Sequence, residues 1–300
     1  MSILDWYRYH VKDGSVSNMF YHLNLGLWRK LGEQITFGTP IWEDPWDVMV
    51  VLDGCRYDTM KAVAGEFDWC NDVSAEYSVG SESGDWMETT FSTEKYQSDL
   101  SSTAYVTANG KTDQHINSDN LYKLDEVWRY AFDFDWGTVP AKSVTDRAID
   151  VARSDSPDRL LVHYMQPHFP VVPPASDGES VPDCLLDSNW EHIRQDPTVT
   201  SDVLSRFAVK NLRYVMNSVE RLLQNIDAER VVITADHGNL FGEFEALGLW
   251  GHPPNLPVPL LKRVPWVVTD AENTANEDPE LEPSLETGDL EEKLSALGYK

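Results

Sequence analysis

Four short apolar runs, each rich in β-branched residues, alternate along this chain with stretches of helical periodicity. The runs are WDVMVVLDG (46–54), TAYVTAN (103–109), DRLLVHYMQPH (158–168) and ERVVITADHG (229–238). Between them lie the amphipathic patterns GDWMETTFSTEKYQ (84–97), AKSVTDRAIDVARS (141–154) and SDVLSRFAVKNLRYVMNSVERLLQNI (201–226). This alternation predicts an α/β fold, with a largely parallel or mixed central β-sheet covered by helices on both faces.

The length and composition predict one large domain with small additions. The chain has 300 residues, of which 41% are hydrophobic. We predict a helical lead-in over residues 1–45, a main domain over 46–270 and an acidic tail over 271–300 that ends in a short helix. Residues 172–200 are rich in Pro, Asp and Ser and predict a long surface excursion that could act as a lid.

The net charge of −26 argues against a nucleic acid as partner, because binding to a phosphate backbone needs clustered Lys and Arg. The acidic tail does not account for this charge. It holds nine acidic residues and two lysines, so the first 270 residues still carry a net charge of −19. This even spread suggests a halophilic protein, since a salty cytoplasm would screen the repulsion among its carboxylates.

The cysteine content and the amino terminus favour a cytoplasmic location. Cys55, Cys70 and Cys184 are irregularly spaced and contain no CxxC pair, which makes a disulfide framework unexpected. The first 20 residues lack the apolar stretch of a signal peptide, and no transmembrane segment is expected. The amphipathic segment 20–32 suits a helix packed on its own domain, with peripheral membrane association as the alternative.

Polar residues gather where the predicted strands end, which is where open α/β sheets place their functional groups. Asp53 ends the first run, and a carboxylate there must be paired, used as a cap or bound to a metal. Asp236 and His237 end the last run, and Gly238 permits a sharp exit of the chain. An Asp–His pair suits Zn²⁺, Mn²⁺ or a similar divalent ion.

Histidines recur near the other run ends. His168 and His252 each lie in a loop stiffened by proline, in HYMQPHFP and WGHPPNLP, and such placement favours a functional role over a purely structural one. His163 lies inside an apolar strand and is expected to be a hydrogen-bonded interior residue.

An ordered set of motifs resembles the sulfatase-like members of the alkaline phosphatase superfamily. The motifs are VVLDGCRYD, SVGSESGDWMETTF, YVTAN, VHYMQPHFP, VITADHGNLFGE, GHP and RVPW, and they cover residues 46–268, with LGYK at the end of the chain. The resemblance implies an alkaline-phosphatase-like catalytic domain over residues 46–270. It also implies one bound divalent metal ion (Zn, Mn, Mg or Ca), with room for a second.

The resemblance assigns roles to individual residues. Asp53 matches the first metal-binding aspartate of the family, and Asp236 with His237 matches its later Asp–His metal pair. His168 and His252 match histidines that contact the charged group of the substrate or help to hold a second ion. Candidates for completing a second site are Asp177, Asp183 and Asp187.

Ser83 aligns with the nucleophilic hydroxyl of the family, which also ligates the metal. A helix is predicted to start near Trp86, and backbone amides at a helix N-terminus favour an alkoxide and an incoming anion. Ser83 as a plain N-cap and Ser81 as the nucleophile are the alternatives. Arg56 matches an arginine after the first strand, where a structural pair with Asp58 is at least as well supported as a catalytic role.

One departure from the family narrows the chemistry. Formylglycine-dependent sulfatases need Cys or Ser followed by x-Pro-x-Arg, and the chain has no such stretch. The resemblance therefore implies a metal-dependent hydrolase or transferase with a serine nucleophile. Its substrate would be a small-molecule, glycan-linked or lipid-linked anionic ester, namely a phosphate ester, phosphodiester or phosphoglycerol group ahead of a sulfate ester. The alternative is a degenerate member that serves as a binding or scaffold protein in cell-surface glycan or lipid assembly.

Overall fold

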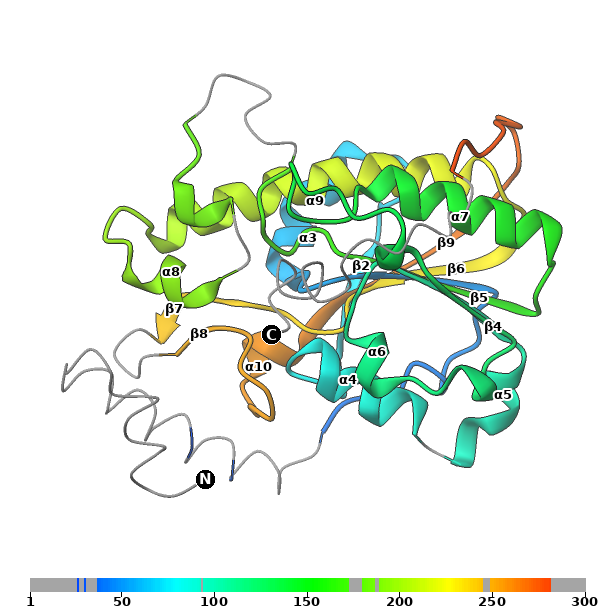
Figure 1. The fold of residues 1–300 in the computed structure, drawn as a ribbon, viewed down its shortest axis with the longest axis horizontal. Coiled ribbons are helices and arrows are strands. Elements are labelled where there is room, and N and C mark those ends of the chain that lie inside the picture. Colours follow the sequence, from blue (N-terminus) through cyan, green and yellow to red (C-terminus); the bar gives the residue numbers. More distant parts are fainter. Residues whose placement is uncertain are drawn as a thin grey trace.

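A seven-stranded mixed sheet with helices on both faces forms the centre of the protein (Figure 1). The computed structural model describes residues 26, 30, 37–92, 94–172, 180–186, 189–244 and 249–281. The strand order is β2-β9-β6-β1-β5-β3-β4. The strands are β1 Val48–Leu52, β2 Val73–Tyr77, β3 Thr103–Thr107, β4 Lys123–Glu126, β5 Arg159–Tyr164, β6 Ala228–Thr234 and β9 Arg263–Ala271. The predicted fold class is confirmed.

The parallel part of the sheet decides where functional groups can meet. Strand β1 pairs in parallel with β5 and β6, and β3 pairs in parallel with β4 and β5. Strand β9 runs antiparallel to both β6 and β2. The carboxyl ends of β1, β3, β5 and β6 therefore lie along one edge of the sheet, where the loops after these strands converge.

Both faces of the sheet are buried, and β1 shows this by its alternation. Val48, Val50 and Leu52 belong to one hydrophobic cluster, whereas Met49 and Val51 belong to another. The first cluster lies under α3 Tyr57–Val63, α7 Ala141–Ser154 and α9 Ser201–Leu223. The second lies under α4 Ser83–Phe91 and α5 Gln97–Ser101. A strand with apolar contacts on both sides needs a continuous apolar run, which is the pattern seen in VMVVL.

A smaller, separate layer lies at one end of the molecule. It consists of a hairpin, β7 Leu240–Phe244 and β8 Leu249–Gly251, with α8 Trp190–Gln195 beside it. Leu185, Ile193 and Val199 pack there against residues of α9 and β7. Much of the predicted excursion at 172–200 thus has a hydrophobic core of its own. The remaining short elements are α6 Thr112–His115, α10 Pro259–Lys262 and 3-10 turns at Ala64–Glu66, Glu94–Tyr96, Ser118–Asn120, Val127–Arg129 and Asp183–Leu185.

Some sequence predictions fall outside the described residues. These are most of the lead-in over 1–45, including the amphipathic segment 20–32 apart from Gly26 and Lys30, and the terminal helix predicted within 290–300. Among the helices that the structure describes, none has the length and apolar character needed to cross a membrane.

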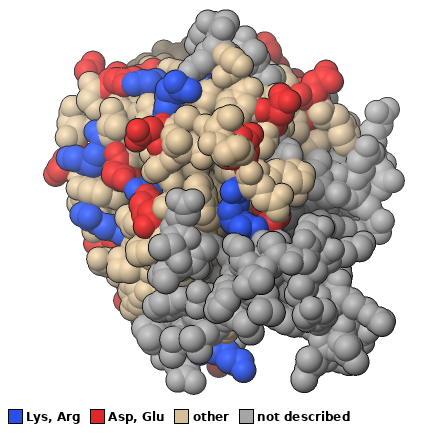
Figure 2. All heavy atoms as spheres, turned by 90° about the vertical axis from the view of Figure 1, so that its left-hand side faces the viewer, with Lys and Arg blue, Asp and Glu red and all other residues tan. Residues whose placement is uncertain are grey.

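Charged side chains are interspersed on the face shown in Figure 2. Acidic groups (red) lie among basic groups (blue) and uncharged surface over the described part of that face. Elsewhere in the described chain, exposed charges form ion pairs, as in the contact of Arg213 with Glu66 at 2.7 Å. On this face, the negative net charge does not mark out a binding site.

Candidate metal centre and active site

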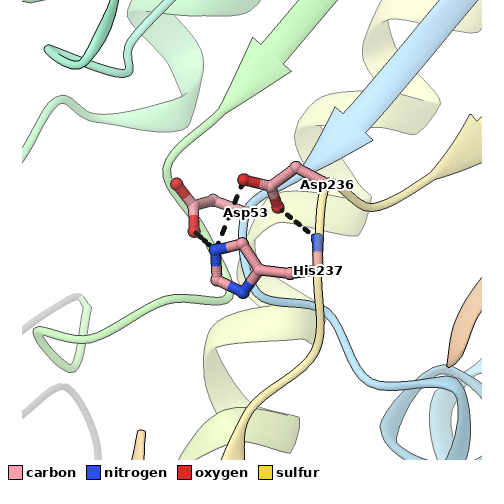
Figure 3. A group of neighbouring side chains, drawn as sticks. All are labelled: Asp53, Asp236 and His237. Carbon is pink, nitrogen blue, oxygen red and sulfur yellow. Dashed lines mark hydrogen bonds and ion pairs between the residues drawn. The ribbon is translucent and has the colours of Figure 1, made fainter. Parts of the chain in front are cut away.

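The loops that leave β1 and β6 bring three potential metal ligands together. Asp53 follows β1 directly, and Asp236 and His237 follow β6. Each offers one ligand atom, and these atoms all lie within 4.8 Å of one another. Figure 3 shows the imidazole of His237 facing both carboxylates, with Nε2 at 3.5 Å from Oδ1 of Asp53 and 3.4 Å from Oδ2 of Asp236. All three side chains are buried.

Backbone contacts close the two loops on each other. Gly54 has a φ of +66°, a conformation that favours glycine. Its N–H donates to Oδ1 of Asp236 at 3.1 Å, and its carbonyl accepts from the Asn239 side chain at 2.9 Å. At Gly238 a Cβ atom would lie 2.3 Å from the Leu260 carbonyl oxygen, so glycine is required there by a close backbone approach. The loops are therefore fixed by contacts that do not depend on a metal.

A comparison of the buried carboxylates tests whether a cation fits between Asp53 and Asp236. The other buried aspartates of the described chain have basic partners, since Asp125 pairs with Arg147 at 2.8 Å and Asp146 pairs with Arg221 at 2.7 Å. Among the described residues, the ion-pair partners of Asp53 and Asp236 are histidines alone.

The orphaned oxygens of this pair point to the same conclusion. Oδ1 of Asp53 and Oδ2 of Asp236 are buried and have no hydrogen-bond partner among the described residues. They are also the two oxygens that face Nε2 of His237. Buried charge without a partner is costly, and a divalent cation coordinated by these oxygens and the imidazole would remove that cost. The residues present therefore fit a divalent metal ion.

The tautomer of His237 leaves Nε2 unprotonated, and this is the nitrogen that faces the two carboxylates. Its Nδ1 lies 2.7 Å from the backbone carbonyl oxygen of Gly238. A carbonyl oxygen can only accept, so Nδ1 carries the proton and Nε2 presents its lone pair to the two carboxylates. Histidines that ligate metals commonly have this second hydrogen bond, which fixes the ring and its tautomer.

The two carboxylates influence each other's ionisation in the metal-free protein. Burial and the neighbouring charge of Asp236 raise the pKa of Asp53 well above its usual range. Burial acts in the same direction on Asp236, but His237 and His163 outweigh it, so the pKa of Asp236 lies below its usual value. One carboxyl of the pair thus resists ionisation until a positive charge is present.

Ser83 lies beside this group, at the first residue of helix α4. The helix begins at Ser83 and not near Trp86, because Glu82 is its N-cap and accepts from the backbone N–H of Asp85. The Ser83 hydroxyl donates to Oδ2 of Asp53 at 3.3 Å, and its oxygen is 3.4 Å from Nε2 of His237.

Ser81 occupies a different environment. Its hydroxyl oxygen lies 2.9 Å from Asp85, lies 3.0 Å from the carbonyl of Pro253 and accepts from the N–H of Leu256 at 2.9 Å. These contacts tie it to the loop after β8. Of the two serines considered from the sequence, the structure brings Ser83 to the candidate metal ligands.

Asn109 is a further member of the site, and the sequence analysis did not single it out. It is fully buried two residues after β3, and its side-chain amide donates to Oδ2 of Asp53 at 2.7 Å and to Oγ of Ser83 at 3.0 Å. The available signal was its position at the end of TAYVTAN, just past its strand, as Asp53 is just past β1. Asn109 therefore orients both the hydroxyl and the carboxylate.

His168 and His252 form a pair next to the candidate ligands. Nε2 of His168 is 2.8 Å from Nε2 of His252, and the ring centres of His252 and His237 are 4.6 Å apart. Nδ1 of His168 donates to the Phe169 carbonyl oxygen at 2.6 Å, so its Nε2 accepts and Nε2 of His252 is the donor. Burial lowers the pKa of His168 to about 4, and burial with nearby His237, His168 and Lys111 lowers the pKa of His252 well below its usual value. Both rings are neutral near pH 7.

An aromatic side chain covers this histidine pair. The ring centre of Trp190, at the start of α8, lies 6.3 Å from that of His168 and 6.0 Å from that of His252. Because α8 belongs to the predicted excursion at 172–200, this segment does border the site. Nothing in the structure tests its movement as a lid.

Two of the remaining sequence candidates, Arg56 and Asp183, are described by the structure and do not belong to the three-residue ligand group. Arg56 makes a two-point contact with Asp58, at 2.8 and 2.6 Å, and also pairs with Glu243. It thus has the structural role that the sequence left open. Asp183 is exposed in its 3-10 turn, whereas residues 177 and 187 lie outside the described chain. The structure does not place Asp183 as part of a second metal site.

Comparisons with known proteins were made at three levels. No family model and no curated protein matches the sequence. Among solved structures, the C-terminal periplasmic domain of Escherichia coli EptC in complex with Zn is similar, with a TM-score of 0.47, 11% identity and coverage of 80% of this chain and 77% of that chain.

Two further solved structures are similar in fold. A protein in the alkaline phosphatase superfamily from Vibrio parahaemolyticus has a TM-score of 0.45 and 13% identity, and the match covers 86% of this chain and 70% of that one. The phosphoglycerol transferase GacH of Streptococcus pyogenes, in complex with sn-glycerol-1-phosphate, has a TM-score of 0.43 and 12% identity, with coverage of 84% and 75%. These similarities concern the fold alone, and they include the superfamily to which the sequence motifs pointed.

The predicted cytoplasmic location is corrected by these comparisons. The similar E. coli structure is a periplasmic domain, which points away from the cytoplasm. The prediction relied on the irregularly spaced cysteines and on the amino terminus. Cys55 and Cys70 are free and buried within the fold, so packing accounts for their lack of pairing, and they do not report the compartment.

Proposed function

We propose that this protein is a metal-dependent hydrolase or transferase that acts on a phosphate ester, phosphodiester or phosphoglycerol group through Ser83. One observation carries the proposal. Two buried carboxylates present orphaned oxygens to a bare imidazole nitrogen, and a serine hydroxyl at a helix start lies within 3.3 and 3.4 Å of the same group. Such a set of ligands beside a hydroxyl suits phosphoryl transfer.

The chain's own residues supply the parts of the reaction. The Ser83 oxygen would attack phosphorus while the bond from phosphorus to the leaving oxygen breaks, and Oδ2 of Asp53 is the acceptor within reach of the hydroxyl proton. Asn109 holds the Ser83 oxygen in place by donating to it. The phosphoserine formed would then pass its group to water or to an acceptor hydroxyl, which restores Ser83.

A divalent cation held by Asp53, Asp236, His237 and Ser83 would lower the pKa of the serine hydroxyl and offset the negative charge of the substrate. The Nε2–H of His252 is engaged by Nε2 of His168, so it would donate to an oxygen of the phosphoryl group only after turning from His168 to the substrate. The amino end of α4, where Ser83 lies, would favour the same anion through the helix dipole. Zn²⁺ fits a site of two carboxylates and one imidazole, and the similar E. coli domain is a Zn complex.

The substrate class follows from the chemistry and not from the shape of a pocket. A serine nucleophile without the formylglycine motif favours phosphate over sulfate esters. One of the structures similar in fold is a phosphoglycerol transferase, in accord with a substrate attached to a glycan or a lipid. A pure scaffold role is disfavoured, because a binding protein has no use for two buried carboxylates with orphaned oxygens.

The test compares two serines two residues apart. Ser83→Ala should lower turnover of an activated phosphodiester or phosphomonoester by on the order of 10³-fold or more, because the attacking oxygen is removed. Zinc content should persist through the other three ligands. Ser81→Ala is the matched control and should retain activity within a few-fold, since its hydroxyl binds the loop after β8.

The other outcomes decide against specific parts of the proposal. Full activity of Ser83→Ala with loss in Ser81→Ala would mean that the nucleophile is Ser81. If the wild-type enzyme turns over substrate and neither change matters, covalent catalysis is ruled out and an activated water replaces it. A wild-type protein that binds zinc but hydrolyses or transfers none of these esters would support the scaffold.

A further inference from the structure

His163 lies in the middle of the central sheet, directly behind the two candidate metal-binding carboxylates. It belongs to β5, pairs in register with Val51 of β1 and Thr107 of β3, and is fully buried. Its Nε2 lies 3.7 Å from Oδ2 of Asp236 and 3.9 Å from Oδ2 of Asp53, and it has no hydrogen-bond partner among the described residues. A buried polar atom without a hydrogen-bond partner costs free energy of folding, so its presence in this place needs an explanation.

The other ring nitrogen of His163 is bonded to Tyr105. The Tyr105 hydroxyl lies 2.8 Å from Nδ1. That hydroxyl also bonds to the Thr107 side chain, whose oxygen accepts the backbone N–H of Asn109 at 3.0 Å. These bonds form a chain that leads from the loop after β3 to the imidazole.

The neighbouring charges decide which nitrogen of His163 has the proton. With the proton on Nδ1, the lone pair of Nε2 would face two carboxylates, which is repulsive. With the proton on Nε2, an N–H dipole points at both carboxylates and Tyr105 donates to Nδ1. The second arrangement gives Nδ1 a hydrogen bond from Tyr105 and turns the Nε2–H toward negative charge, so electrostatics selects it.

Aromatic packing holds the ring in this orientation. The ring centre of Trp86 is 5.5 Å from that of His163 in an edge-to-face contact, and the ring of Tyr105 is stacked at 6.3 Å. His163 is outside the three-residue ligand group, whose atoms lie within 4.8 Å of one another. It is thus placed behind the carboxylates and not among the ligands.

From these contacts we propose that His163 is a positioning residue, whose Nε2–H, fixed by the Tyr105 hydroxyl, orients both carboxylates toward the metal position. It faces Oδ2 of Asp53 and leaves Oδ1 of that residue for the ion, and on Asp236 it faces Oδ2, the oxygen that His237 also faces. The inference rests on the proposed function in that it treats the carboxylates as metal ligands. Outer partners of this kind typically contribute 10- to 100-fold to metal affinity.

The first experiment needs no metal. In metal-free protein labelled with ¹⁵N-histidine, NMR should show His163 with its proton on Nε2 and with Nδ1 accepting a hydrogen bond. Tyr105→Phe removes the hydroxyl but keeps the ring, and it should abolish the hydrogen-bond shift at Nδ1. A proton found on Nδ1 in the wild type overturns the proposal, whether or not the protein binds a metal.

The second experiment measures Zn²⁺ affinity by competition with a chromophoric chelator. His163→Phe keeps an aromatic ring without a donor and should weaken binding 10- to 100-fold, whereas His163→Gln restores an N–H near the Nε2 position and should stay within about five-fold of wild type. Phe91→Leu is the packing control. Phe91 stacks on Tyr105 at 5.2 Å but makes no bond to His163, so this change should lower the melting temperature without altering zinc affinity.

Two outcomes contradict the inference while leaving the proposed function intact. One is a zinc affinity of His163→Phe equal to that of wild type. The other is an X-ray absorption spectrum of the zinc protein that requires two imidazole ligands, which would make His163 a direct ligand. Absence of zinc binding by the wild type would instead refute the proposed metal site, and the NMR measurement would then decide the donor role alone.

Discussion

Clusters of carboxylates lie at both ends of the parallel strands of the central sheet, but the two clusters differ in burial. At the edge where β1, β5 and β6 begin, six acidic side chains line an open hollow, and all six are exposed. They are Asp47, Asp158, Asp227, Glu229, Asp270 and Glu272. At the edge where the same strands end, Asp53 and Asp236 are buried with orphaned oxygens.

The difference shows that acidity alone does not identify a metal site. Water satisfies the exposed carboxylates, and some of them cap loops, as Asp47 does for the N–H of Arg230 at 2.8 Å. The buried pair is shielded from water, and among the described residues its ion-pair partners are histidines with no Lys or Arg, which favours a cation supplied from outside. Burial therefore makes the aspartate pair a candidate metal site, whereas the exposed carboxylates of the hollow are solvated.

Removal of a proposed metal ligand should show the largest difference in metal content between the two carboxylate clusters. Asp236→Ala or His237→Ala should abolish stoichiometric binding of a divalent ion, with zinc affinity reduced more than about 100-fold, since a direct ligand counts for more than an outer partner. The fold should remain largely intact. Elemental analysis after purification in high salt measures the metal content, and circular dichroism checks the fold.

Asp270→Ala is the matched control for this measurement, because Asp270 is exposed in the hollow at the other edge. It should keep the metal content of the wild type. If Asp236→Ala or His237→Ala keeps stoichiometric metal, the metal does not bind at the buried carboxylates. If Asp270→Ala loses the metal, the exposed carboxylates are involved in binding it.

Acid should destabilise the carboxyl-end site in the metal-free protein. Burial lowers the pKa of His168 to about 4, below the usual 6.5, so between these values the unfolded chain binds a proton that the folded chain does not. The contribution of His168 to stability is therefore complete above pH 6.5 and is lost as the pH drops toward 4, by about 3 kcal/mol in all and about 2 kcal/mol by pH 5. Urea unfolding in EDTA at pH 7 and pH 5 measures this loss.

His168→Asn serves as the comparison for the pH effect. The asparagine amide can still donate to the Phe169 carbonyl, but it does not titrate, so the variant should lose less stability between pH 7 and pH 5 than the wild type. An equal loss in both proteins would mean that the acid sensitivity comes from groups other than His168.

The smallest expected effect concerns salt and the exposed carboxylates. With a net charge of −26, the protein should melt at a lower temperature in dilute buffer than in molar salt, because repulsion among exposed carboxylates is then unscreened. Thermal melts at the two salt concentrations measure it. An unchanged midpoint would remove the halophilic interpretation.

The sequence predicted the parts of the fold that have a strong period. The helix expected at 141–154 has those bounds, and the four apolar runs contain β1, β3, β5 and all of β6 except its first residue. Strands β2 and β4 were not predicted, because VSAEY and KLDE are short and partly exposed at or near the sheet edges. Their pairing with neighbouring strands, and not their local pattern, makes them strands.

For the candidate site, too, the sequence could predict only the residues that have a recognisable local pattern. The grouping of Asp53, Asp236 and His237 could be predicted, because polar residues placed just after apolar strands are recognisable in the sequence. Asn109 and His163 could not be assigned roles in this way. Their contacts depend on which strands are neighbours, and the order β1-β5-β3 that brings them to Asp53 is known only from the three-dimensional structure.

The two ligand-bearing loops are joined by bonds that leave the coordinating atoms unused. Gly54 donates to Oδ1 of Asp236 and accepts from Asn239, whose carbonyl accepts from Arg56 at 3.2 Å. The loops are thus held at ligand distance before an ion arrives, so metal uptake requires desolvation of the ion and no ordering of the chain. We expect that one divalent ion can be exchanged for another by dialysis of the folded protein, without a refolding step.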